Sequence, residues 1–161
     1  MSSEILVNKS VEKVQAALTH FGIATKITQF PEGTRTAQEA AAAIGCSVAQ
    51  IVKSIIFCTE KNNSPILVLT SGINRVDEKM IEQALGEKIK KASADFVKEV
   101  TGFAIGGVPP VGHAQKITTF IDKDLLHYQE VWAAAGTPYT VFCLISSDLS
   151  RITDGAVVKV T

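Results

Sequence analysis

Apolar and polar residues follow two different spacings along this chain. Near the start, apolar residues recur every three or four positions, as on one face of a helix, with Ser10 as the expected cap and Gly22 as the end. Residues 51–58 are instead almost continuously apolar, which is typical of a strand buried on both faces. The same criteria predict further helices over 36–44, 77–85, 93–102 and from 147, and further strands over 23–30, 65–70, 88–92, 116–121, 129–134, 140–145 and 156–160.

Polar residues mark where several of these elements begin or turn. Thr36-Ala-Gln-Glu39 is a capping box, in which the threonine hydroxyl and the glutamate each satisfy a free amide of the first turn. Ser47-Val-Ala-Gln50 repeats this pattern before a short helical turn, and 31–33 and 61–64 are typical turns. Because the connections are short, we expect many antiparallel strand pairs in a single α/β domain over residues 1–161.

The composition excludes several classes of protein. With 161 residues, of which 46% are hydrophobic and 20% charged, the chain has the size and residue usage of one ordinary globular domain. Its formal net charge is zero, so a nucleic-acid partner would have to be held by a local group of cations. The start carries no signal pattern, no apolar run is long enough to span a bilayer, and the three cysteines show no disulfide or zinc spacing. We therefore expect a cytoplasmic protein that makes no contact with a membrane.

Lys53 is the unusual residue of the strand predicted over 51–58. With a period of two it shares a face with Ile51 and Ile55, and apolar residues occupy the other face as well. Because an unpaired ammonium is costly inside a protein, this one needs an anion, a pocket or a route to water. Two interpretations stay open, an ion-binding site or a lysine at a strand end whose charge reaches solvent.

The glycine- and proline-rich stretch over 102–113 is the second unusual feature. Its four glycines and two prolines fix an uncommon backbone path. Glycines let the main chain approach a ligand closely, and exposed amides in such a loop hold an oxyanion or a phosphate. The stretch matches neither the dinucleotide-binding pattern nor the phosphate loop with its lysine, and an ordinary tight loop is the alternative interpretation.

Other catalytic arrangements lack their characteristic residues. The G-x-S-x-G motif that carries the nucleophile of many serine hydrolases is absent, so the sequence does not support a serine hydrolase. His20, His113 and His127 are scattered and show no metal-ligand spacing with the cysteines. We expect His113 to form a hydrogen bond within the loop rather than to act as a base, and we expect neither a metal nor a cofactor.

Lys53 within 50–54, followed about fifty residues later by the 102–112 loop, resembles the YbaK/ProX family of aminoacyl-tRNA editing domains, which is associated with prolyl-tRNA synthetase. The similarity extends over nearly the whole chain. It implies a mixed, mostly antiparallel, barrel-like sheet surrounded by helices. It also implies hydrolysis of the ester between an amino acid and the terminal adenosine of tRNA. The expected partners are the acceptor end of an aminoacyl-tRNA and, secondarily, an aminoacyl-tRNA synthetase.

The resemblance also assigns roles to single residues. It implies that the lysine contacts the phosphate or ribose of the substrate, that the G-x-x-x-P loop positions the aminoacyl carbonyl, and that water or a substrate hydroxyl attacks. The implied catalytic residues are Lys53, Gly106, Gly107, Val108 and Pro110, and the implied substrate-binding residues are Thr36, Ser54, Gly112, His113, Ala134 and Gly136. Thr36 also has a full structural explanation as a helix cap. Ala134 stands where relatives often carry serine, which removes one polar contact to the aminoacyl group.

Three functions are compatible with these features. The first is a freestanding trans-editing deacylase that removes a small, wrongly attached amino acid such as alanine, cysteine, serine or threonine. The second is a noncatalytic domain of the same fold that binds tRNA or a synthetase. The third is a small-molecule ester or amide hydrolase that uses the same loop. Deacylation of a panel of charged tRNAs separates the first from the second, because a binding domain gives no turnover.

Metal removal provides a first test. Because the cysteines and histidines lack ligand spacing, and the implied mechanism has no place for zinc-bound water, a chelator followed by dialysis should leave the deacylation rate unchanged. Initial rates before and after treatment measure this. A loss of activity that zinc specifically restores would contradict the expectation.

Overall fold

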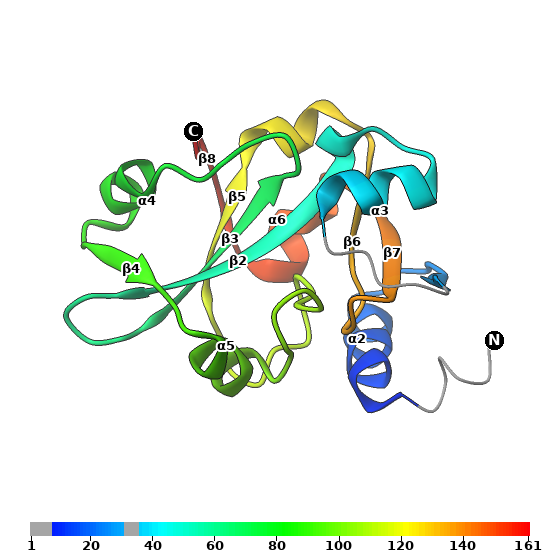
Figure 1. The fold of residues 1–161 in the computed structure, drawn as a ribbon, viewed down its shortest axis with the longest axis horizontal. Helices are drawn as coiled ribbons and strands as arrows, with labels where there is room; N and C mark the ends of the chain where they lie inside the picture. Colours follow the sequence, from blue (N-terminus) through cyan, green and yellow to red (C-terminus); the bar gives the residue numbers. More distant parts are fainter. Residues whose placement is uncertain (1–7, 31–35) are drawn as a thin grey trace.

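The structure is a computed structural model that describes residues 8–30 and 36–161, and its centre is a mixed sheet of eight strands (Figure 1). The strands are β1 (Ile27–Gln29), β2 (Ile51–Thr59), β3 (Pro65–Ser71), β4 (Ile89–Lys91), β5 (Thr118–Asp122), β6 (Glu130–Ala134), β7 (Thr140–Ile145) and β8 (Ala156–Val158). The helices are α2 (Lys9–His20), α3 (Ala37–Ile44), α4 (Glu78–Leu85), α5 (Ala94–Thr101) and α6 (Asp148–Thr153), with short 3₁₀ helices η1 (Val48–Gln50) and η2 (Lys123–His127).

The strand order combines antiparallel and parallel neighbours. Along the sheet it is β1-β7-β6-β2-β3-β5-β8, and β4 pairs with β2 outside this path. The pairs β2–β3, β2–β4, β6–β7 and β1–β7 are antiparallel, whereas β2–β6, β3–β5 and β5–β8 are parallel. The α/β class with a mixed sheet and surrounding helices, predicted from the sequence, is therefore confirmed.

The long strand β2 separates a large core from two smaller ones. On one face, Val52 and Ile56 belong to the largest cluster of buried residues, which also contains apolar residues of α2, α5 and α6. On the other face, Phe57 packs with Ile81 of α4 in a second cluster, and Ile51 packs with alanines of α3 in a third. Since Lys53 faces the same way as Ile51 and Phe57, it lies between these two smaller clusters.

Helix ends follow the sequence signals in most places. Gly45, Gly86 and Gly102 end α3, α4 and α5 in the left-handed conformation, as expected for C-terminal glycines. The cap of α2 was predicted wrongly, because Asn8 and not Ser10 holds the first turn. The Asn8 side-chain oxygen accepts from the amides of Ser10 and Val11 at 2.9 and 3.2 Å, which places Ser10 inside the helix.

Strand ends depart more from the predictions. The strand expected over 23–30 pairs only over Ile27–Gln29, and before it the Thr25 hydroxyl donates to the Cys143 carbonyl at 2.7 Å. The turn predicted at 31–33 lies outside the described residues, and the 3₁₀ helix Lys123–His127 was not predicted at all. In the part of the chain that the structure describes, no helix has the length and apolar character needed to cross a membrane.

The revised cap of α2 is directly testable. Replacing Asn8 by alanine removes the acceptor for two first-turn amides and should lower the free energy of unfolding by about 1 kcal/mol. The matched control Ser10→Ala should change it by less than about 0.5 kcal/mol, since Ser10 contributes its backbone amide and not its hydroxyl to this cap. Urea denaturation of both variants measures the difference. Equal losses, or a larger loss for Ser10→Ala, would restore the original prediction.

Candidate functional site

Lys53 lies in the first half of β2, opposite Thr70 of β3. Its side chain is half-buried, and its ammonium nitrogen donates a hydrogen bond to the carbonyl oxygen of Asn74 at 2.6 Å. The partner that a lysine in this position requires is therefore a backbone carbonyl of the loop that follows β3.

A buried carboxylate holds that carbonyl in place. Asp122 is only 1% exposed, and it accepts hydrogen bonds from the Ser71 amide at 2.9 Å, the Asn74 side-chain amide at 2.8 Å and the Asp124 amide at 2.9 Å. The Asn74 side chain also donates to the carboxylate of Asp124 at 2.8 Å. Because β3 and β5 are parallel neighbours, their carboxyl ends meet at the same edge of the sheet, where Ser71 and Asp122 lie.

Sequence reasoning missed Asn74, Asp122 and Asp124. The signal was present, since polar residues directly follow the strands predicted over 65–70 and 116–121. It becomes meaningful only once these two strands are known to be parallel neighbours.

The electrostatics of Lys53 reflect both burial and this network. Desolvation lowers the pKa of Lys53 below its ordinary value, and the negative charge of Asp122 acts in the opposite direction. A charge that is partly removed from water interacts more strongly with an anionic group placed beside it. Lys53 is therefore suited to bind an anionic or strongly polar part of a ligand.

A pocket of about 270 Å³, called the small pocket below, opens beside Lys53. It brings together several of the residues assigned from the sequence, namely Thr36, Lys53, Ser54, Gly106, Val108 and Ala134. Other elements complete its wall with Ala37, Ala40, Ile51, Val52, Trp132, Ala133, Thr137, Pro138, Thr140 and Val141. The wall is thus mostly small and apolar, with a lysine and a few hydroxyl groups as its polar members.

Three assigned residues lie elsewhere. Pro110, Gly112 and His113 line a separate pocket of about 340 Å³. There the Nε2 atom of His113 is 2.7 Å from the Pro109 carbonyl oxygen, which matches the expected role of this histidine within the loop. Burial lowers the pKa of His113, with the hydrogen bond to Pro109 opposing the shift, so the neutral ring donates its Nε2 proton.

Gly107 and Gly136 serve close packing between two loops. A Cβ atom added to Gly107 would lie 2.8 Å from the Gly136 carbonyl oxygen and 2.8 Å from the Cα atom of Thr137. Gly136 has a positive φ of 106° and is itself pressed against the Ser10 carbonyl. The Gly107 amide donates to the Ala104 carbonyl at 3.0 Å, so its hydrogen bond belongs to the turn. Both glycines therefore hold the wall of the small pocket in place rather than line it.

The hydroxyl groups of the small pocket differ in whether another group of the protein forms a hydrogen bond with them. The hydroxyl of Thr36 accepts from the Glu39 amide at 3.1 Å, which confirms its capping role. The hydroxyl of Ser54, by contrast, is buried and has no hydrogen-bond partner within the described residues. Since buried hydroxyls nearly always have a partner, this unpaired group is an unusual feature of the strand beside Lys53.

The residues described around the small pocket offer positioning and charge. Among residues 8–30 and 36–161, no group of three or more histidine, cysteine, aspartate or glutamate side chains is placed to hold a metal ion. An ammonium, an unpaired hydroxyl and a glycine loop around a small apolar pocket are suited to orienting a substrate and stabilising negative charge on it.

Comparison with known proteins agrees with this description. A model of the family described as "Aminoacyl-tRNA editing domain" matches residues 31–152. The protein YwhH of Bacillus subtilis (strain 168), which is uncharacterized, is 32% identical over 142 residues, which cover 88% of this chain and 90% of that protein. A proline–tRNA ligase of Bacillus licheniformis is 30% identical over 147 residues, covering 88% of this chain but 25% of the ligase.

A solved structure has nearly the same fold. It is described as a "putative trans-editing enzyme for prolyl tRNA synthetase", and it superposes with a TM-score of 0.90 at 43% identity, covering 96% of this chain and 98% of the other. The fold is therefore shared with a protein of similar length.

The contact between the two loops predicts that a methyl group added at Gly107 lowers the stability of the protein. Gly107→Ala should lower the free energy of unfolding by about 1–3 kcal/mol, because its Cβ atom must push the Gly136–Thr137 backbone away. The control Ala104→Ser, at an exposed position of the same loop, should change it by less than about 0.5 kcal/mol. Urea denaturation measures both values. Wild-type stability for Gly107→Ala would show that the loops do not touch as described.

Proposed function

The chain belongs to the family of aminoacyl-tRNA editing domains, and from this we propose that it is a freestanding deacylase that hydrolyses the ester of a mischarged tRNA. The observation that carries the proposal is the small pocket, whose wall includes Lys53 of β2 together with Gly106 and Val108 of the glycine loop. The similarity to a structure described as a trans-editing enzyme for prolyl tRNA synthetase supports the same reaction. We place this reaction in the cytoplasm and assign the editing domain to the whole chain.

The reaction requires little covalent chemistry from the protein. Water, or a hydroxyl of the substrate acting before water, attacks the carbonyl carbon of the aminoacyl ester. The bond to the ribose oxygen then breaks, and the products are a free amino acid and a tRNA with a free terminal hydroxyl. A positioned ester and stabilisation of the oxyanion formed on the carbonyl are the contributions that a site without a nucleophile makes.

Lys53 supplies positive charge at the entrance of the small pocket, where it binds the ribose or phosphate side of the ester. In the free protein the Asn74 carbonyl holds this ammonium in a fixed position. Such preorganisation matters because a charge that needs no reorientation during the reaction stabilises the transition state most effectively.

The dimensions of the small pocket favour a small amino acid. About 270 Å³ between alanine, valine and threonine side chains accommodates alanine, cysteine, serine or threonine. Ala134 adds no polar group to this wall, so the aminoacyl side chain is selected by size more than by hydrogen bonds. The partners we propose are the acceptor end of an aminoacyl-tRNA and a synthetase that produces the mischarged species, with prolyl-tRNA synthetase as the first candidate.

A panel of tRNAs charged with alanine, cysteine, serine or threonine tests the proposal. We expect single-turnover hydrolysis of at least one of them, well above the rate without protein. Binding of charged tRNA without turnover would identify a noncatalytic domain instead. Hydrolysis of free aminoacyl esters at the same rate as charged tRNA would identify a small-molecule hydrolase.

Substitution of Lys53 tests the site itself. Loss of a charge-assisted contact in Lys53→Ala should lower the single-turnover rate by about 30- to 1,000-fold. Stability should change by less than about 1 kcal/mol, since water reaches the Asn74 carbonyl in place of the half-buried ammonium. The matched control Lys61→Ala, in the exposed turn after the same strand, should leave the single-turnover rate and the stability unchanged. A destabilised Lys53→Ala protein with normal turnover would make this lysine structural.

A further inference from the structure

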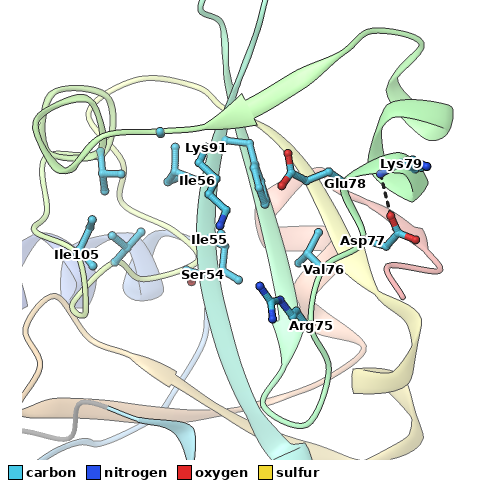
Figure 2. A pocket seen from close by; sticks show the side chains of 14 residues that line it. Ser54, Ile55, Ile56, Arg75, Val76, Asp77, Glu78, Lys79, Lys91 and Ile105 are labelled. Carbon is cyan, nitrogen blue, oxygen red and sulfur yellow. Dashed lines mark hydrogen bonds between the residues drawn. The ribbon is translucent and has the colours of Figure 1, made fainter.

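A second pocket, of about 650 Å³ and called the large pocket below, lies farther along β2 (Figure 2). The two pockets meet at Ser54 of β2 and Val108 of the glycine loop, which line both. The small pocket lies on the Lys53 side of this junction, and the large pocket lies on the side of Ile55 and Phe57. The two pockets are therefore neighbours that share part of their wall.

The walls of the large pocket are mainly apolar. Ile55 of β2, Val76 of the loop before α4 and Val97 of α5 line it, and Ile105 of the glycine loop is 60% exposed at its edge. Its volume falls within the range of sites that bind small organic molecules, roughly 300 to 1,000 Å³. Such walls suit a flat ring system, because burial of its faces against aliphatic side chains does not depend on matched hydrogen bonds.

Charged groups of both signs surround these walls. Figure 2 shows the nitrogen ends of Arg75 and Lys91 turned toward the middle of the pocket from two sides, whereas Lys79 points away from it. Glu78 also lines the pocket, and its carboxylate is an acceptor for hydroxyl or amino groups. Asp77 lines the pocket as well, but its carboxylate accepts from the Lys79 amide at 3.0 Å, so Arg75 and Lys91 are the groups placed to bind a phosphate.

We propose that the large pocket binds the terminal nucleoside of the aminoacyl-tRNA, so that the ester lies across Ser54 and Val108 and the aminoacyl group enters the small pocket. This inference rests on the proposed function. The base would lie against Ile55 and Ile105, and the phosphate would lie near Arg75 or Lys91.

The relative sizes of the pockets favour this orientation over the reverse. A small amino acid fills about 270 Å³ far better than 650 Å³, and a nucleoside needs the larger volume. The ester links the two parts directly, so their sites must adjoin, and the shared residues Ser54 and Val108 provide that contact.

Binding of adenosine 5′-monophosphate to the intact protein tests the inference without any turnover. In amide-resolved NMR titrations we expect the largest shifts at Ile55, Val76 and Ile105. Ile105→Asp places a negative charge at the apolar edge and should weaken binding about tenfold. The control Leu126→Asp, at another exposed apolar residue outside both pockets, should bind like wild type.

Catalysis adds a second, separate readout. In deacylation of charged tRNA, Ile105→Asp should raise KM while kcat falls much less, because Ile105 contacts only the nucleoside. Shifts confined to the amides around Lys53, or no shifts at nucleotide concentrations of tens of millimolar, would overturn the inference and leave the proposed deacylase standing. Shifts in the large pocket of a protein that hydrolyses no charged tRNA would support the nucleoside site and refute the deacylase.

Discussion

The site depends on one constraint: a lysine on an apolar strand needs a polar partner. Lys53 lies between two hydrophobic clusters, and its ammonium is bound by a backbone carbonyl of the loop after β3. That loop has a fixed shape because Asp122, almost fully buried, accepts hydrogen bonds from the Ser71 and Asn74 groups. A buried carboxylate with three donors is stable where an unpaired one would not be. The direction of the lysine therefore follows from the pairing of β3 with β5.

The same strand arrangement explains why two pockets adjoin. β2 is longer than the elements that cover it, so α3 covers its beginning and α4 approaches its far half (Figure 1). The glycine loop closes the remaining space from one side, with Val108 at the point where the small and the large pocket meet. Gly107 lets this loop approach the Gly136 turn more closely than any other residue would. Rigid packing of two loops thus defines the junction at which an ester would lie.

Local signals in the sequence were sufficient for much of this fold. The threonine cap of α3, the C-terminal glycines of α3, α4 and α5, and the apolar run of β2 each act within a few residues, so they could be interpreted without tertiary contacts. Lys53 and the 106–108 loop stood out for the same reason. The partner of Lys53 could not be found this way, since Asn74 and Asp122 are 48 residues apart and meet only through a parallel strand pair. Nor could the sequence separate Val108, whose side of the loop faces the small pocket, from Pro110 and His113, which line another.

The most direct test of the account is a crystal structure of the protein with a nonhydrolysable analogue of the substrate end, 3′-alanylamino-3′-deoxyadenosine 5′-phosphate. The account predicts the alanyl group in the small pocket, its carbonyl beside the 106–108 loop, the ribose within hydrogen-bond distance of Lys53 or Ser54, and the adenine against Ile55 and Ile105. A ligand bound beside His113 in the separate pocket, or an alanyl group in the large pocket with the adenine near Thr36, would contradict it.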